Sequence, residues 1–168
     1  KLVEELIPTM LPLGTVVRVL GNLLKEGIPI RDLRSILEGI SDQAASTKDP
    51  DVLTEYARQA LARTITKQYQ TSDGSLQVIT LDPRLDRSLA DQVAALPPGA
   101  ALQLDPTLSH KLLTGIKQAA ERVAARGQQP IIICSQVVRR HLRRHSDRIL
   151  HSVPVMGFNE VDSFVRLQ

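Results

Sequence analysis

Aromatic residues and cysteine are scarce in this sequence. Aromatic side chains make up 2% of the 168 residues and there is no Trp, so the core must be built from Leu, Ile, Val and Ala. This scarcity disfavours the proteins that read nucleic acids by stacking bases on aromatic rings. Cys134 is the one cysteine, which excludes a disulfide within the chain and fits a reducing compartment.

Long apolar runs are also lacking, because none approaches the roughly 20 residues that a membrane-spanning helix needs. The sequence begins at Lys1 inside a helix-like pattern and shows no signal peptide, so we expect a fragment of a longer protein. The net charge of +3 is unevenly placed. Residues 1–75 hold nine Lys and Arg against ten Asp and Glu, whereas residues 76–168 hold twelve against eight. The second half is therefore only mildly basic.

The first half has the apolar spacing of helices. Gly27 ends a first helix, Pro29 begins a second, and Asp49-Pro50 gives a third its N-cap and first-turn proline. The apolar residues of the first helix are expected on one face: Leu13, Val16, Val17, Leu20, Leu23 and Leu24. The third helix, which continues to Ile65, is expected to carry an outer polar face: Glu55, Arg58, Gln59, Arg63 and Lys67. Three short helices predict a small helical module.

The pattern changes after Thr71–Gly74, the turn signal TSDG. Beyond it the sequence alternates between short apolar runs typical of strands and helical periodicity, with Asp105-Pro106 opening the longest helix and Gly127 following its end. The expected strands are residues 76–81, 101–104, 130–134, 153–156 and 164–167. Alternation of this kind predicts an α/β layer. The fold class is therefore α+β, a small helical subdomain followed by a small α/β subdomain with a mixed sheet of four to five strands.

No catalytic or metal-binding constellation emerges from the residues. His141 and His145 share a helix face in HLRRH, but a zincin motif has Glu where Leu142 stands, and the neighbouring arginines would repel a dication. Cys134 ends an expected buried strand, where a buried small residue explains it better than a reactive thiol does. Ser135 fits a helix cap, because it lacks the flanking glycines of a nucleophile elbow. We expect no enzyme activity, no metal and no cofactor.

One predicted helix, over residues 136–148, is rich in arginine. It offers a candidate basic partner surface: Arg139, Arg140, Arg143, Arg144 and Arg148. Such a surface suits a phosphate backbone, an anionic membrane or an acidic protein, and a merely solvated face is the alternative. The modest charge of the second half and its few aromatics weigh against nucleic acid.

The stretch IPIRDLR places Arg31, Asp32 and Arg34 off the apolar stripe of the second helix. Asp32 in the first turn suits the helix dipole, whereas the two arginines oppose its positive end. Residues that work against the local helix preference are candidates for an external contact, and arginine is common at interfaces. A solvated helix start is the alternative.

Several segments together resemble a known family. VRVLGNLLKEGIPIRDLRSILEGISDQA, followed by DPDVLTEYARQALARTITKQY, resembles the C-terminal cytoplasmic region of the FlhA-type flagellar type III export-gate proteins. The virulence counterparts of that family are the SctV-type gates, InvA and MxiA. Two LDP segments, PIIICS, a basic helix and VPVMGFNEV follow in the family's order. Gly157-Phe158 departs from the Ser-Tyr of the family pattern, and the sequence stops early at Gln168.

The resemblance implies a parent protein anchored in the bacterial inner membrane, whose cytoplasmic part forms a nine-membered ring. It implies that residues 1–12 end a preceding subdomain, residues 13–72 form a third, helical subdomain, and residues 75–168 form a fourth. The implied partners are other copies of the chain, export chaperone–substrate complexes and the export ATPase stalk, and no nucleic acid. With their off-stripe positions, the resemblance suggests six residues for the ring contact: Arg31, Asp32, Arg34, Glu55, Arg58 and Arg63. A nucleic-acid-binding module that uses residues 136–148 is the alternative function.

Overall fold

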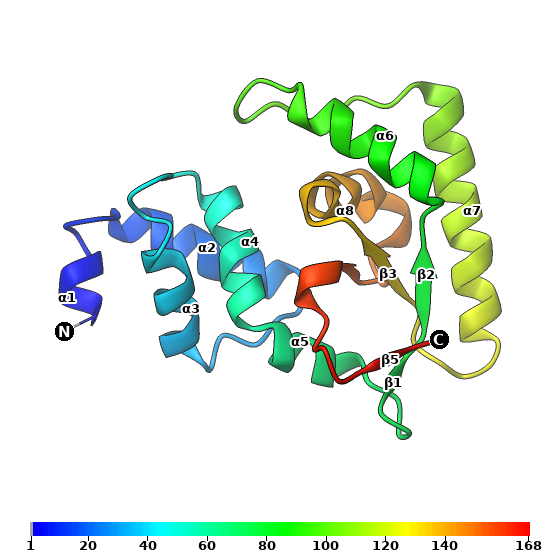
Figure 1. Cartoon of the computed structure of the whole chain (residues 1–168), viewed down its shortest axis with the longest axis horizontal. Coiled ribbons are helices and arrows are strands. Elements are labelled where there is room, and N and C mark those ends of the chain that lie inside the picture. The colour runs from blue at the N-terminus through cyan, green and yellow to red at the C-terminus, as the bar shows by residue number, and fades with distance from the viewer. Residues whose placement is uncertain (1) are drawn as a thin grey trace. The chain divides into compact units, whose positions relative to one another are not determined.

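The computed structural model describes residues 2–168, except for the side chains of Leu2 and Arg148, and it divides into two units. The first unit ends at Ile65, and the second runs from Thr66 to Gln168 (Figure 1). The first unit is helical and the second combines helices with short strands, so the predicted α+β class is confirmed. The subdomain limits expected at 1–12, 13–72 and 75–168 remain predictions. Across residues 2–168, no helix has both the length and the apolar character needed to cross a membrane.

The helices of the first unit begin and end at residues suited to those positions. They are α1 (Leu2–Leu6), α2 (Leu13–Lys25), α3 (Leu33–Ser41), α4 (Pro50–Ala60) and the start of α5 (Ala62–Tyr69). Asp49 caps α4, since its carboxylate accepts a hydrogen bond from the Asp51 N–H at 2.9 Å. Gly27 follows α2 with a φ of +71°, a conformation that favours glycine. The single third helix expected over Asp49–Ile65 is instead two helices, which meet at Leu61.

Helix α2 has two apolar faces, not the one expected. Val16, Val19 and Leu23 are buried and form its inner face. Leu13, Val17 and Leu24, which the sequence placed on the same stripe, are more than half exposed. Leucine and valine recur every three or four residues on both faces of this helix. The spacing alone therefore could not distinguish the buried face from the exposed one.

The second unit contains two small sheets with parallel pairing only. Strands β2 (Val78–Thr80), β3 (Ile131–Cys134) and β4 (Val155–Gly157) form one sheet in that order. Strand β1 (Ser75–Leu76) pairs with β5 (Arg166–Leu167) in the other. The larger sheet has three strands and parallel pairing, where a mixed sheet of four to five strands was predicted. The expected strand at 101–104 is irregular, and β1 and β5 pair separately after Gln77 interrupts the expected first strand. Every residue of β3 is buried, as expected for a central strand of a parallel sheet.

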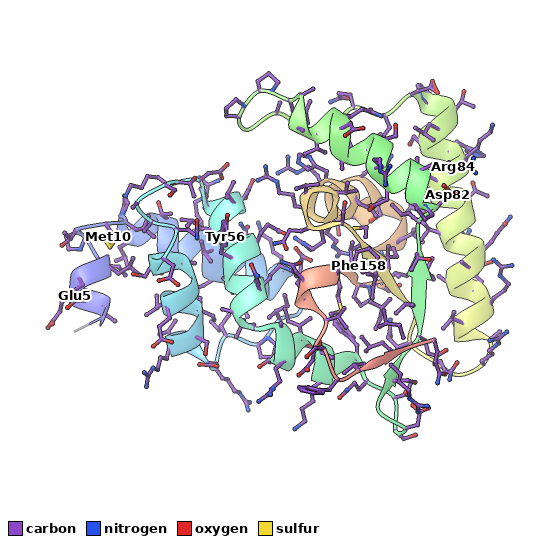
Figure 2. All side chains as sticks on the ribbon, viewed as in Figure 1. Glu5, Met10, Tyr56, Asp82, Arg84 and Phe158 are labelled. Atoms are coloured by element: carbon purple, nitrogen blue, oxygen red, sulfur yellow. The ribbon has the colours of Figure 1, made fainter. Side chains whose placement is uncertain are left out.

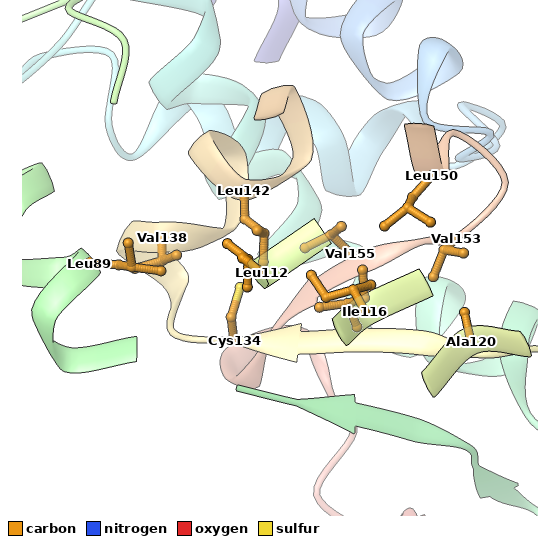
Figure 3. Close-up of a cluster of buried hydrophobic side chains, with 11 residues drawn as sticks. Leu89, Leu112, Ile116, Ala120, Cys134, Val138, Leu142, Leu150, Val153 and Val155 are labelled. Atoms are coloured by element: carbon orange, nitrogen blue, oxygen red, sulfur yellow. The ribbon is translucent and has the colours of Figure 1, made fainter. Parts of the chain in front are cut away.

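Three helices pack with the larger sheet and build the core of the second unit. They are α6 (Pro83–Ala94), α7 (Pro106–Ala124) and α8 (Gln136–Leu150), and a short 3-10 helix, η1 (Phe158–Glu160), follows β4. Figure 3 shows the core between them, which is aliphatic apart from one thiol. Its members are Leu89, Leu112, Ile116, Ala120, Ile132, Cys134, Val138, Leu142, Leu150, Val153 and Val155. The core therefore uses the aliphatic residues that the composition demanded.

A buried ion pair joins α8 to the segment after β4. The Arg139 Nε lies 3.8 Å from the Glu160 Oε1, and the two side chains are 2% and 0% exposed. Arg139 also donates from Nη1 to the Val155 carbonyl at 3.3 Å, and Glu160 Oε2 accepts the Gly157 N–H at 3.2 Å. The hydroxyl of Thr66 on α5 donates to the Glu160 carbonyl at 3.0 Å. This cluster fixes the chain where β4 ends.

His141 is a second unusual buried group of α8. Its side chain is largely buried, and its Nε2 has no hydrogen-bond partner among the described atoms. Burial lowers the pKa of His141, and the charges of Arg140 and Arg144 lower it further. The neutral imidazole is therefore the form that the folded chain accommodates.

Replacing Glu160 by Gln will destabilise the chain strongly, because Arg139 then keeps a buried charge without a carboxylate. We expect a loss of about 3–5 kcal/mol in the free energy of unfolding, measured by urea denaturation. Glu38→Gln is the control, since Glu38 pairs with Arg34 at 2.8 Å on the surface, where such a pair contributes about 0.3–0.5 kcal/mol. The double variant Arg139→Met/Glu160→Gln should lose less than the sum of the single losses. Additive losses would contradict the pairing.

Acidification will weaken the fold through His141. Since its pKa is lower in the folded chain, the unfolded chain binds the proton more readily, and the stability falls as the pH drops below about 6.5. His141→Leu should remove part of this loss, measured as the free energy of unfolding between pH 7.5 and 5. His110→Gln, at an exposed position of α7, should leave the wild-type pH dependence intact. Identical profiles for wild type and His141→Leu would refute the assignment.

Candidate functional site

The start of α3 exposes the three charges that the sequence nominated. Arg31, Asp32 and Arg34 all lie on the surface. Asp32 is the N-cap of α3: its carboxylate accepts the Ser35 N–H at 3.1 Å and the Ser35 hydroxyl at 2.7 Å. These hydrogen bonds, the hydroxyl first, hold the pKa of Asp32 below its usual value. Capping the helix is therefore enough to explain an aspartate at position 32, and no contact with another protein is needed for that.

The two arginines of this stretch differ in their surroundings. Arg34 forms an ion pair with Glu38 one turn along the helix, with the Nε 2.8 Å from Oε1 and an arginine side chain that is 85% exposed. The Arg31 side chain makes no ion pair or hydrogen bond within residues 2–168. Both guanidinium groups are accessible to another molecule, because a surface pair such as Arg34–Glu38 is weak and easily exchanged.

The expected outer face of the third helix is wrong at two positions. Glu55 and Arg58 are buried, with exposed fractions of 8% and 2%. Arg58 Nη1 pairs with the Glu26 carboxylate at the end of α2 at 3.0 Å. Asn22 on α2 likewise donates to Asp51 at 3.2 Å. The polar face of α4 is thus part of the packing against α2, and periodicity missed it because polar residues were assumed to face solvent.

Arg63, the last of the six nominated residues, is exposed on α5. The structure therefore leaves four of the six on the surface and uses the other two inside the helical unit.

The basic partner surface expected on α8 is largely not a surface. Arg139 is buried against Glu160, and Arg143 donates to the Val153 and His151 carbonyls at 3.2 Å each. Arg143 also pairs with Asp147 at 2.9 Å. Arg140 is half-buried and Arg144 is exposed, whereas the side chain of Arg148 lies outside the described part. The guanidinium groups serve as donors to the carbonyls around β4, a use that residue spacing cannot reveal.

The two histidines of α8 do not form a metal site. His141 is buried, whereas His145 Nε2 lies 2.7 Å from the Ser109 hydroxyl on α7. Within residues 2–168, no group of three His, Cys, Asp or Glu side chains is close enough to hold a metal ion. The imidazoles therefore take part in packing within the second unit.

Sequence reasoning missed a hollow at the carboxyl ends of the parallel strands. It has a volume of about 530 Å³ and its wall is mostly apolar. Its lining comes from β2, β3, α6 and the residue after β4: Thr80, Leu81, Pro83, Asp86, Arg87, Ala90, Ile133, Cys134, Ser135 and Phe158. Figure 2 labels Phe158, which is 53% exposed, and Asp82 with Arg84 at the start of α6. Carboxyl ends of parallel strands often border binding crevices, so the strand pattern was the available signal.

The chemistry of this hollow favours binding over reaction. The Asp86 carboxylate accepts the Ser135 N–H at 3.1 and 3.2 Å and the Ser135 hydroxyl at 3.2 Å, so its charge is used at the start of α8. Ser135 stands at the N-cap position of α8, as the sequence predicted, but its side chain makes no capping hydrogen bond and its hydroxyl donates to Asp86 of α6. Cys134 is buried, and its thiol lies 4.0 Å from the Met156 carbonyl. These residues provide no activated nucleophile beside a base.

Curated relatives align along nearly the whole chain. The flagellar biosynthesis protein FlhA of Bacillus subtilis is 36% identical over 167 residues, which is 99% of this chain and 25% of the relative. FlhA of Salmonella typhimurium is 38% identical over 157 residues, 94% of this chain and 22% of the relative. The chain thus spans about a quarter of the length of the relatives it matches.

Solved structures of related proteins have the same fold. The Chlamydia pneumoniae CdsV protein is similar with a TM-score of 0.85 and 29% identity, over 100% of this chain and 48% of that one. The nonameric SctV-C of EPEC is similar with a TM-score of 0.85 and 28% identity, over 99% of this chain and 50% of that one. CdsV has also been solved in complex with CdsO, where the TM-score is 0.84. The family described as FHIPEP matches residues 1–166, and the chain belongs to this family.

Proposed function

We propose that this chain is the C-terminal part of the cytoplasmic domain of a type III protein export gate. The observation that carries the proposal is its likeness to the nonameric SctV-C, which extends over 99% of the chain. In the proposed assembly nine copies form a ring at the cytoplasmic face of the inner membrane. The ring would dock export substrates, their chaperones and the stalk of the export ATPase.

A flagellar role is favoured over a virulence role. FlhA proteins are 34–38% identical to the chain over 157–168 residues, whereas the low calcium response locus protein D of Yersinia pestis is 27% identical over 168 residues. Identity that is higher by several percentage points over one continuous alignment supports the flagellar branch. We therefore propose that the chain serves the export of flagellar components.

The ring contact is proposed to use the exposed charges of the helical unit. Arg31, Arg34 and Arg63 are accessible, and arginine forms bidentate pairs with carboxylates of a neighbouring copy. Asp32 would act by fixing the start of α3, and its Ser35 hydrogen bonds support that role. Arg58 would contribute only indirectly, because its buried ion pair with Glu26 holds α4 against α2, and the buried Glu55 offers little surface to a neighbouring copy.

Partner docking is proposed for the second unit, by analogy with the CdsV–CdsO complex. The exposed Arg144 and half-buried Arg140 remain from the expected basic surface, and the hollow beside Phe158 adds an apolar element. The alternative of nucleic-acid binding loses its main support, since Arg139 is buried and Arg143 is committed to carbonyls and Asp147.

Reversing the charges at the start of α3 will impair export. Cells that lack their own export gate would be complemented with the full-length protein carrying Arg31→Glu and Arg34→Glu. We expect secretion to fall about tenfold or more, because like charges across a contact cost several kcal/mol. Glutamate near a helix N-terminus suits the dipole, so the fold of α3 should survive the change.

The matched control is Lys117→Glu with Arg122→Glu, two exposed cations of α7. It makes the same change in charge and should leave secretion near the wild-type level. Membrane levels of each variant are measured by immunoblotting. Normal secretion by the Arg31/Arg34 variant at a normal membrane level would reject the proposed contact and identify the stretch as a solvated helix start.

A further inference from the structure

The exposed apolar face of α2 has the spacing of a helix-packing seam. Leu13, Val17, Leu20 and Leu24 follow one another at intervals of four, three and four residues, as the seam residues of a coiled coil do. Leu13, Val17 and Leu24 are 61%, 57% and 55% exposed, and Leu20 is partly buried. The face runs for about 16 Å along the helix, at 1.5 Å per residue. Isolated exposed apolar residues are ordinary, but these four side chains in register over three turns form a continuous strip.

We call this strip the α2 seam. One of its flanks carries two glycines and, beyond them, two cations. Gly14 and Gly21 come next around the helix, and a side-chain carbon added at either would meet nothing within 4 Å. Beyond these glycines lie Arg18 and Lys25, both exposed. Neither side chain makes a hydrogen bond or ion pair within residues 2–168. On the other flank the helix turns into its buried face. A helix laid on the seam could therefore approach closely over the glycines and bring its own side chains to the two cations.

We infer that the α2 seam docks an amphipathic helix of another protein, which carries aliphatic residues at seam spacing and acidic residues along one edge. The aliphatic residues would cover the seam, and the carboxylates would meet Arg18 and Lys25. The inference rests on the surface of this chain alone and does not depend on the proposed ring.

A second copy related by a two-fold axis fits this face poorly. In such a pair of antiparallel α2 helices, the cationic flank of one copy would meet the cationic flank of the other. Arg18 and Lys25 would then repel their counterparts. A strip one helix wide is also small for a stable interface between folded domains, which typically buries about 800 Å² on each partner. A single docked helix matches both its width and its charge.

The test titrates the 168-residue chain with a defined probe. The probe is a fluorescent 15-residue peptide, held helical by lactam bridges, with leucine at four seam positions and glutamate along one flank. A control peptide has lysine in place of each glutamate. We expect the glutamate peptide to bind at least about tenfold more tightly by fluorescence anisotropy, with a preference that declines as salt is added.

Three variants locate the binding. Val17→Ser/Leu24→Ser should weaken it about tenfold or more without unfolding the chain, because exposed substitutions change stability by only about 0.5 kcal/mol. Arg18→Glu/Lys25→Glu should reverse the preference in favour of the lysine peptide. Val137→Ser/Ile149→Ser is the matched control, since it removes two apolar side chains of similar exposure from α8 and should change nothing.

Three results would overturn the inference. The first is equal binding of the two peptides, or none. The second is binding that the seam variants leave intact. The third is a concentration-dependent dimer in sedimentation velocity that Val17→Ser/Leu24→Ser abolishes, because the occupant of the seam would then be a second copy. Failure here leaves the export proposal standing, since that proposal is tested by the α3 charges and by secretion.

Discussion

The packing of the second unit depends most on the interactions of one buried residue, Glu160. It lies in a 3-10 helix of only three residues, which could not hold its position by its own backbone hydrogen bonds. Its side chain takes the Gly157 N–H and the Arg139 guanidinium, while its carbonyl takes the Thr66 hydroxyl. One residue thus joins the end of β4, the face of α8 and α5. Desolvating two charges is costly, so these groups must all be satisfied together for the arrangement to be stable.

Gly157 shows how closely the chain is packed around that carboxylate. A side-chain carbon at this position would lie 2.7 Å from the Asn159 Oδ1 and 3.4 Å from the Gln136 Cα. The first contact is shorter than real side chains tolerate, whereas the second is an ordinary van der Waals distance. Glycine here leaves room for the Asn159 amide beside the carboxylate of Glu160. The neighbouring Phe158 lines the hollow at the strand ends together with Ser135.

Helix boundaries were the part of the fold that the sequence could predict. Asp49-Pro50 and Asp105-Pro106 do cap and begin α4 and α7, and Gly27 and Gly127 do adopt the positive φ expected after a helix. These signals are local, because a cap or a terminating glycine satisfies backbone groups within a few residues of itself. The strands were predicted less well. A two- or three-residue strand is defined by its partner, and pairing depends on contacts distant in the chain.

For the candidate site, the sequence analysis assumed that charged side chains are exposed. The prediction was correct only for the residues that meet this assumption. Arg31 and Arg34 are exposed as expected, whereas Arg58 and Arg139 are buried beside Glu26 and Glu160. Each buried arginine has its acidic partner at least 20 residues away in sequence, so no spacing rule connects the two. The mistake at α2 was the opposite one, since apolar spacing suggested burial where the side chains face solvent. In both cases the missing information was the identity of the neighbouring element, which the periodicity of one helix does not contain.

The two phenylalanines of this protein lie outside its aliphatic core. The chain has two phenylalanines, and both are exposed, Phe158 by 53% and Phe164 by 89%. Burying a phenylalanine side chain stabilises a protein by about 1.5–3 kcal/mol, so the fold forgoes this contribution at both positions. Aromatic side chains are enriched at protein interfaces, where they supply a large contact area at a small cost in side-chain entropy. The stability of the chain therefore comes from leucine, isoleucine and valine with a few buried ion pairs. Its aromatic side chains at 158 and 164 remain available for contacts with other molecules, as the aliphatic seam of α2 does in the helical unit.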